Sequence, residues 1–129
     1  MAKDNNIIRV GIVGLGSMGK NHYRILKSFY DVEIVAICDV DESITTDEIF
    51  YTDLNEMLSR ESLDAVIIAV PTFLHKEIAV QCIRKGLHVF IEKPVASNSK
   101  EGQEILQEVN KHNISAVVGH VERFNPVVI

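Results

Sequence analysis

The chain has 129 residues, about the length of one ordinary domain, and 47% of them are apolar against 24% charged. This balance predicts one compact domain with a buried core. The 13 Lys and Arg residues are scattered and are outnumbered by 18 Asp and Glu, for a net charge of −5. Binding to a nucleic-acid backbone needs clustered cations, so a nucleic-acid partner is excluded.

No membrane partner is expected either. The first residues, MAKDNN, contain no apolar segment, and the longest apolar run, Ala65 to Val70, is far shorter than the roughly 20 residues that span a bilayer. Cys38 and Cys82 lie in apolar stretches and form neither a CxxC pair nor a disulfide framework. We therefore expect a cytoplasmic protein whose two cysteines are inert core residues.

Short apolar runs alternate with amphipathic stretches along the chain. This alternation is typical of βαβ units and predicts an α/β fold, a doubly wound parallel sheet covered on both faces. We expect six strands, at residues 7–13, 33–38, 49–51, 65–70, 87–91 and 115–118. Residues 53–59 are a candidate short helix, whereas 41–48 are weakly patterned.

Apolar side chains at helical spacing predict three longer helices between the strands. Their stripes are Met18, His22, Ile25, Leu26 and Phe29; Leu74, Ile78, Cys82 and Ile83; and Ile105, Leu106 and Val109. Thr72 is expected to cap the second helix at its start, and Gly86 to follow its end. Asn98 with Glu101 is expected to cap the third.

A glycine-rich turn, Gly14-Leu-Gly16-Ser17-Met18-Gly19, directly follows the first strand and precedes the first helical stripe. Gly14 permits a tight turn, Gly16 lets a pyrophosphate approach the backbone, and Gly19 allows close packing of helix on strand. The helix N-terminus, with Ser17 and Met18, then presents unpaired amides and a partial positive charge to the phosphates. The turn therefore predicts a dinucleotide site.

The sequence also contains an acidic residue at the position where a dinucleotide site requires one. Asp39 follows the second strand, 20 residues after Gly19 (39 − 19), where it can accept hydrogen bonds from both hydroxyls of the adenosine ribose. The same charge would repel a 2′-phosphate, and Val40 and Asp41 supply no cation to hold one. The sequence thus favours NAD over NADP.

Two other interpretations of the glycine turn are weaker. Gly14 to Lys20 also spells GxxxxGK, the phosphate loop of P-loop NTPases, but Asn21 lacks the hydroxyl that should bind Mg²⁺. A P-loop also has no need of Gly16 and Asp39. A plain strand-to-helix turn would not explain why strand, helix stripe and acidic residue occur together.

Taken together, these motifs resemble the N-terminal domain of the Gfo/Idh/MocA oxidoreductases. The resemblance runs nearly end to end and is carried by Gly14 to Gly19 with His22, Asp39, residues 63–71 with His75, Glu92-Lys93-Pro94, and Gly119-His-Val-Glu-Arg-Phe-Asn-Pro126. It implies a six-stranded Rossmann domain over residues 1–119. Residues 120–129 would begin the connection to a second α/β domain, which closes over the substrate in the family and is absent from this chain.

The resemblance implies that Lys93 lies beside the nicotinamide and hydrogen-bonds the substrate oxygen. Removing hydride from a secondary alcohol requires its proton to leave as well, and an amine near the oxygen can polarise the hydroxyl or accept its proton. The alternative is a solvated loop lysine. The further cofactor contacts that the resemblance implies are Val70, Pro71, Thr72, His75, Glu92 and Arg123.

The histidines carry different expectations. His22 lies on the apolar stripe and is expected to be a hydrogen-bonded core residue. His75 lies in the first turn of a helix, whose dipole disfavours the imidazolium, so a neutral ring available for hydrogen bonding is expected. The others show no metal-ligand spacing, and no metal site is expected: His88, His112 and His120 with Glu122.

The function predicted is that of the NAD-binding domain of a dehydrogenase for a sugar or sugar nucleotide. Residues 119–126 resemble members that oxidise UDP-N-acetylglucosamine or related UDP-sugars at the 3-hydroxyl. The apolar end, Val127-Val128-Ile129, suggests a cut chain, inactive alone, whose full-length form oligomerises through the missing domain. The alternative is a non-catalytic dinucleotide-binding module that senses redox state or binds a partner.

Overall fold

The computed structural model describes residues 7–44 and 46–119, and in it six strands form one parallel sheet of order β3-β2-β1-β4-β5-β6. The strands are β1 (Ile8–Val13), β2 (Val32–Cys38), β3 (Ile49–Tyr51), β4 (Ala65–Ile68), β5 (His88–Glu92) and β6 (Ala116–Gly119). All five neighbouring pairs are parallel. The predicted α/β fold and its six strands are confirmed.

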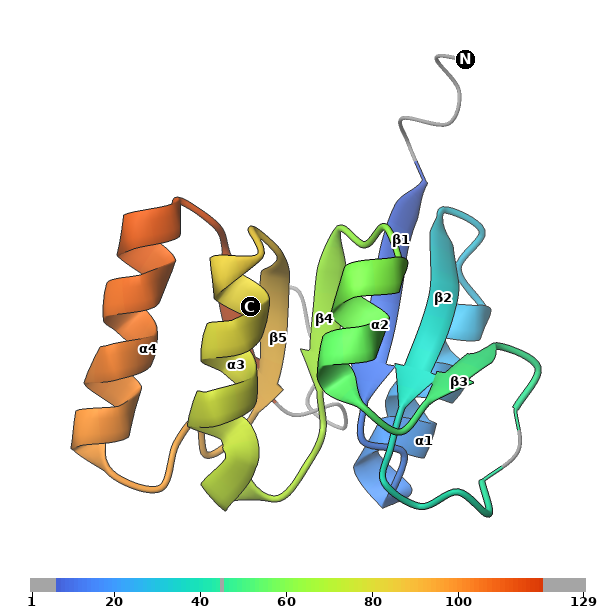
Figure 1. Cartoon of the computed structure of the whole chain (residues 1–129), viewed down its shortest axis with the longest axis horizontal. Helices are drawn as coiled ribbons and strands as arrows, with labels where there is room; N and C mark the ends of the chain where they lie inside the picture. The colour runs from blue at the N-terminus through green and yellow to red at the C-terminus, as the bar shows by residue number, and fades with distance from the viewer. Residues whose placement is uncertain (1–6, 45, 120–129) are drawn as a thin grey trace.

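Helices cover both faces of this sheet. They are α1 (Ser17–Lys27), α2 (Leu54–Arg60), the 3-10 turn η2 (Thr72–Leu74), α3 (His75–Arg84) and α4 (Ser99–His112). In Figure 1, α2, α3 and α4 lie in front of the sheet and α1 lies behind it. Among the described helices, none has the length and apolar composition needed to cross a membrane.

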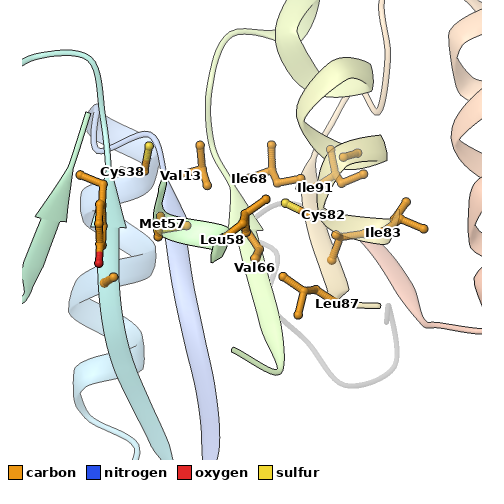
Figure 2. Packing of buried hydrophobic residues seen from close by; sticks show 14 of the residues in the cluster. Val13, Cys38, Met57, Leu58, Val66, Ile68, Cys82, Ile83, Leu87 and Ile91 are labelled. Atoms are coloured by element: carbon orange, nitrogen blue, oxygen red, sulfur yellow. The ribbon is translucent and has the colours of Figure 1, made fainter. Parts of the chain in front are cut away.

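The larger part of the core lies between the sheet and α2 and α3. Ile68 and Ile91 are fully buried against Cys82 and Ile83 of α3 (Figure 2), and burying one such aliphatic side chain contributes about 1.5–3 kcal/mol. Burial raises the pKa of Cys38 to about 11 and that of Cys82 to about 12, so both thiols stay protonated at neutral pH. Both are unpaired and buried, as predicted.

Two predicted helix ends are confirmed. The side chain of Asn98 accepts a hydrogen bond from the backbone N–H of Glu101 at 2.9 Å, which satisfies one amide that the start of α4 leaves unpaired. At the end of α3, Gly86 adopts a φ of +81°, a left-handed conformation that glycine adopts without strain.

Other details of the prediction are wrong. The strand at 65–70 ends at Ile68, because its neighbour β1 ends at the paired Val13 and Gly14 then turns away. Thr72 is not a cap: it begins η2 after Pro71, with no side-chain cap bond. Leu106 of α4 does not belong to the buried stripe: Ile105 faces the core, and the next residue points about 100° further around the helix, so Leu106 is 58% exposed.

Candidate functional site

The predicted site residues that the structure describes lie where β1, β2, β4 and β5 end, or in the turns and helix starts that follow these strands. The carboxyl ends of these parallel strands share one edge of the sheet, the lower edge in Figure 1. Ligands of doubly wound folds bind outside this edge, where the strand order reverses. Here the reversal falls between β1 and β4, because the chain runs from β1 outward to β3 and then from β4 outward to β6.

Two glycines of the turn are required by the protein's own backbone. Gly14 has a φ of +95°, and a Cβ there would lie 2.7 Å from the carbonyl oxygen of Ala69. A Cβ on Gly19 would lie 1.9 Å from the carbonyl oxygen of Gly14. A Cβ on Gly16, in contrast, meets nothing within 4 Å. Gly16 therefore faces open space, as a position approached by a ligand would.

Helix α1 begins immediately behind that open space. Gly16 is its N-cap, so no side chain caps the helix, and its first turn holds no acidic residue. The first amides of a helix have no intrahelical acceptor and carry a partial positive charge. Ser17 is exposed and Met18 is half-buried at this end. The arrangement can bind an anionic group through the backbone.

Asp39 is tied to the glycine turn. One oxygen of its half-buried carboxylate accepts the N–H of Leu15 at 2.7 Å, and the other accepts the N–H of Asp41 at 2.9 Å. Each carboxylate oxygen can accept more than one hydrogen bond, so capacity for ribose hydroxyls remains. The bond to Leu15 is a structural role that sequence reasoning missed, since it joins two loops 24 residues apart.

Two cavities lie on either side of the Val70–Pro71 segment, which lines both. The Asp39 cavity, about 200 Å³, is lined by Val13, Gly14, Cys38, Asp39, Val40, Thr52, Leu54, Val70, Pro71, Leu74 and Ile78. The Lys93 cavity, about 260 Å³, is lined by Met18, Ala69, Val70, Pro71, Thr72, His75, Glu92 and Lys93. The lining of the Asp39 cavity is mainly apolar with a single carboxylate, whereas the Lys93 cavity carries a cation.

The structure therefore brings together residues that the sequence had singled out separately. Every residue lining the Lys93 cavity except Ala69 was a predicted site residue. Most of the apolar lining of the Asp39 cavity was missed. A signal existed for Leu74 and Ile78, which belong to the predicted helical stripe, but Thr52 and Leu54 carry no motif. Arg123 lies outside the described residues.

The loop after β5 holds the predicted catalytic lysine. Lys93 is exposed, its N–H donates to the carbonyl oxygen of Gly119 at 3.4 Å, and a cis peptide joins it to Pro94. The preceding Glu92 is buried and hydrogen-bonded to the buried His22 of α1. His22 is thus a hydrogen-bonded core residue, as predicted, and links α1 to the end of β5, directly before the loop that carries Lys93.

His75 is 1% exposed, and its ring faces the protein backbone. Its Nε2 lies 2.8 Å from the carbonyl oxygen of Val70, and its Nδ1 lies 3.0 and 3.3 Å from those of Pro94 and Val95. Sequence reasoning placed this side chain along the cofactor. The structure places it at the wall of the Lys93 cavity with both ring nitrogens directed at backbone oxygens.

A neighbouring hollow contains a cation that sequence reasoning missed. About 440 Å³ in volume, it is lined by Leu15, Lys20, Tyr23, Asp41, Ser43, Ile44 and Thr46. Hydrogen bonds from the hydroxyl and N–H of Ser43, together with the charge of Lys20, lower the pKa of Asp41. The opposite charges of Asp41 and Lys20 attract each other across this hollow.

A further hollow of about 390 Å³ lies between α3 and α4 and contains none of the predicted site residues. It is lined largely by charged and amide side chains, among them the ion-paired Arg84 and Glu108. Among the described residues, no group of three or more His, Cys, Asp or Glu is placed to hold a metal ion.

Comparison with known proteins gives a consistent set of similarities. Residues 8–120 match the profile of the Gfo/Idh/MocA oxidoreductases, described as a family with an NAD-binding Rossmann fold. 4-Carboxy-2-hydroxymuconate-6-semialdehyde dehydrogenase from Sphingobium sp. is 34% identical over 126 residues, which cover 92% of this chain and 40% of that protein. Myo-inositol 2-dehydrogenase from Thermotoga maritima is 30% identical, covering 92% and 37% respectively.

A solved structure is similar over the same region. The WlbA dehydrogenase from Bordetella pertussis, in complex with NADH and UDP-GlcNAcA, has a TM-score of 0.83 at 28% identity. The match covers 87% of this chain and 36% of that one. The chain thus spans 40% or less of the length of each of these relatives.

Proposed function

Because the chain belongs to the Gfo/Idh/MocA oxidoreductases, a family with an NAD-binding Rossmann fold, we propose that it binds NAD along the carboxyl edge of its sheet. In this proposal it is the cofactor domain of a dehydrogenase that acts on a sugar or sugar nucleotide. The observation that carries the proposal is the pair of cavities that share Val70 and Pro71, one lined by Gly14 of the glycine turn and the other by Met18 of α1.

The residues present fit the parts of a dinucleotide. The apolar Asp39 cavity suits adenine, with the carboxylate at its rim for the ribose hydroxyls. Gly14 lines this cavity and Met18 lines the other, so the open space at Gly16 lies between them along the chain. A pyrophosphate there would meet the uncapped amides of α1. The Lys93 cavity remains for the nicotinamide.

The choice of NAD over NADP follows from charge. A 2′-phosphate on the adenosine ribose would approach Asp39, and the anionic Asp41 lies two residues further along the chain. Lys20 is a cation that could counter this repulsion, but it lines the same hollow as Asp41, whose opposite charge competes for it. The WlbA relative was solved with NADH, which supports the same choice.

When bound, NAD accepts or donates the hydride of the reaction. The protein's part concerns the proton of the substrate hydroxyl. Lys93 is exposed at the end of β5, and its Nζ can donate a hydrogen bond to the substrate oxygen or accept the proton that leaves it. The buried His22–Glu92 contact holds the residue before Lys93 against α1 and so fixes where the lysine loop begins.

The substrate class rests on the relatives rather than on this site. One relative is a myo-inositol dehydrogenase, and another was solved with a UDP-sugar acid. Both ligands carry several hydroxyl groups on a ring, which supports a sugar or sugar nucleotide as substrate. Oxidation of UDP-N-acetylglucosamine at its 3-hydroxyl is the specific form of this proposal, and residues 119–126 suggest it.

Calorimetric titration of the chain with NADH tests the proposal directly. Gly16→Val is the matched variant, because the new side chain enters open space and does not clash with the protein. We expect NADH to bind wild type and to bind the variant at least about tenfold more weakly, since the pyrophosphate can no longer approach α1. The melting temperature of the variant should be unchanged. The proposal would be rejected if wild type gave no heat of NADH binding, or if wild type and Gly16→Val bound NADH with equal affinity.

The dehydrogenase activity is tested on a longer protein, one with the full length of the relatives, of which this chain spans 40% or less. There, loss of sugar oxidation in Lys93→Ala, with NADH affinity retained, would support the catalytic role of the lysine. Tight NADH binding without activity on any polyol or UDP-sugar would favour the non-catalytic redox-sensing module instead.

A further inference from the structure

His75 joins two loops that are separate in sequence and adjacent at the site. It begins α3, and its ring lies between the segment after β4 and the segment after β5. On one side its Nε2 lies 2.8 Å from the carbonyl oxygen of Val70. On the other its Nδ1 lies 3.0 Å from that of Pro94 and 3.3 Å from that of Val95.

All three partners are acceptors, so a ring nitrogen can bond to them only when it carries the proton. The neutral ring has one N–H, which donates either to Val70 or to Pro94 and Val95. With 1% of His75 exposed and both nitrogens directed at the backbone, no ring nitrogen remains for a ligand. Any effect of His75 on the cofactor must therefore pass through the loops that it holds.

The two loops depend on this ring to different extents. The Val70–Pro71 segment has other restraints: the N–H of Ala69 donates to Val13 at 2.8 Å, and the N–H of Leu74 donates to the carbonyl of Pro71 at 2.9 Å. For the carbonyl oxygens of Pro94 and Val95, His75 supplies the hydrogen bonds found within the described residues. Removing the ring nitrogens should therefore loosen mainly the loop that carries Lys93.

We propose that His75 is a positioning residue that holds the Lys93–Val95 loop against the Val70–Pro71 segment and thereby shapes the nicotinamide half of the site. The proposal rests on the proposed NAD-binding function. His75 lines the Lys93 cavity and not the Asp39 cavity, so its effect should be confined to one half of the dinucleotide. This selectivity separates a positioning role from a general contribution to folding.

The test compares NADH with ADP-ribose, which lacks the nicotinamide, by calorimetry on the chain. His75→Phe keeps a buried ring and removes both ring nitrogens. His75→Gln is the conservative variant, because its amide group still donates. Ile83→Ala is the matched control, because Ile83 is fully buried on the same helix and lines neither cavity. Truncating this side chain lowers stability and leaves the hydrogen bonds of His75 in place.

We expect wild type to bind NADH more tightly than ADP-ribose. His75→Phe should weaken NADH binding about tenfold, as expected for one or two lost hydrogen bonds, and change the affinity for ADP-ribose by no more than about twofold. His75→Gln should recover part of the NADH affinity. Ile83→Ala should melt earlier with both affinities unchanged. Parallel losses for the two ligands, or NADH affinity unchanged in both His75 variants, would overturn the inference.

A second measurement needs no ligand. Amide hydrogen exchange at Lys93, Val95 and Ala96 should be faster in His75→Phe and unchanged in Ile83→Ala. If wild type binds neither NADH nor ADP-ribose, the proposed function fails, yet the exchange rates still show whether His75 holds the loop. Exchange that is equally fast in wild type and His75→Phe would reject the positioning role whatever the ligand result.

Discussion

The backbone N–H of Leu15 donates to the carboxylate of Asp39 at 2.7 Å, so the turn after β1 is fastened to the end of β2 by the side chain proposed to hold the ribose. A second bond, from the N–H of Asp41 at 2.9 Å, fixes the other oxygen. The carboxylate is therefore oriented before any ligand arrives. Preorganisation of this kind lowers the entropy lost on binding.

Asp39→Ala should therefore reduce both stability and NADH affinity. We expect the free energy of unfolding to fall by about 1–3 kcal/mol, as for lost hydrogen bonds to a charged acceptor. Chemical denaturation and calorimetry measure the two effects. Asp64→Ala is the control, because Asp64 also accepts a backbone N–H, from Arg9 at 2.9 Å, at the amino end of β4, away from both cavities. An equal loss of NADH affinity in both variants would contradict a ribose-binding role for Asp39.

A second prediction concerns the discrimination against NADP. Hydrogen bonds from Ser43 hold the pKa of Asp41 below its ordinary value and so favour the charged carboxylate, which lines the same hollow as Lys20. Asp41→Asn removes this charge and should raise NADPH affinity by about threefold to tenfold, with NADH within about twofold. Glu42→Gln makes the same charge change at the exposed next residue and should alter neither affinity. Equal responses to the two substitutions would mean that only net charge matters.

The third prediction is a pH dependence away from the site. Hydrogen bonds from Arg84, at 3.0 and 3.2 Å, lower the pKa of Glu108 in the folded chain. A lowered pKa in the folded state stabilises the protein above the ordinary pKa of glutamate, and that contribution is lost as the pH falls through the lowered value. Wild type should therefore be more stable than Glu108→Gln at pH 7, and the difference should shrink on acidification through that range.

Denaturant titrations between pH 7 and pH 2 measure this difference. Glu104→Gln is the control on the same helix, because the Glu104 side chain, paired with Lys76 at 3.4 Å, is 38% exposed against 11% for Glu108, and ion pairs of exposed carboxylates contribute little. A gap between wild type and Glu108→Gln that stays constant over the whole pH range would refute the assignment.

The sequence alone was sufficient for features that depend on local backbone geometry. Gly14 and Gly19 stand where a Cβ would strike the backbone, and Gly86 stands at a left-handed φ. Such positions accept essentially only glycine, so a glycine in the sequence predicts the local backbone conformation directly. Asn98 capping α4 is similar, since the bond spans only three residues.

Features that depend on how distant loops meet could not be inferred. Nothing in the sequence joins Leu15 to Asp39, and the nearness of Lys20 to Asp41 arises only once the loop after β2 folds back over α1. Thr72 has the side chain of a cap, but the chain enters a 3-10 turn there instead. For His75, helical position suggested a neutral ring available for hydrogen bonding, but its partners, the backbone of two loops, follow only from tertiary packing.

The last prediction concerns the buried contact between His22 of α1 and Glu92 at the end of β5, which links the helix proposed to bind the pyrophosphate with the loop that carries Lys93. Phe90 packs against the His22 ring edge to face, with centroids 5.1 Å apart, so the imidazole is held on a second side.

Removing either partner of the His22–Glu92 contact leaves a polar group buried without this contact, which is strongly unfavourable. A double-mutant cycle of His22→Ala and Glu92→Gln, followed by denaturant unfolding, should give a coupling free energy of about 1–3 kcal/mol. The ion pair between Lys27, at the end of α1, and Glu48, just before β3, provides the comparison. Its coupling should be smaller, because the lysine side chain is 48% exposed and solvent competes for it. Additive effects of His22→Ala and Glu92→Gln would show that the helix and the lysine loop are held in place independently of each other.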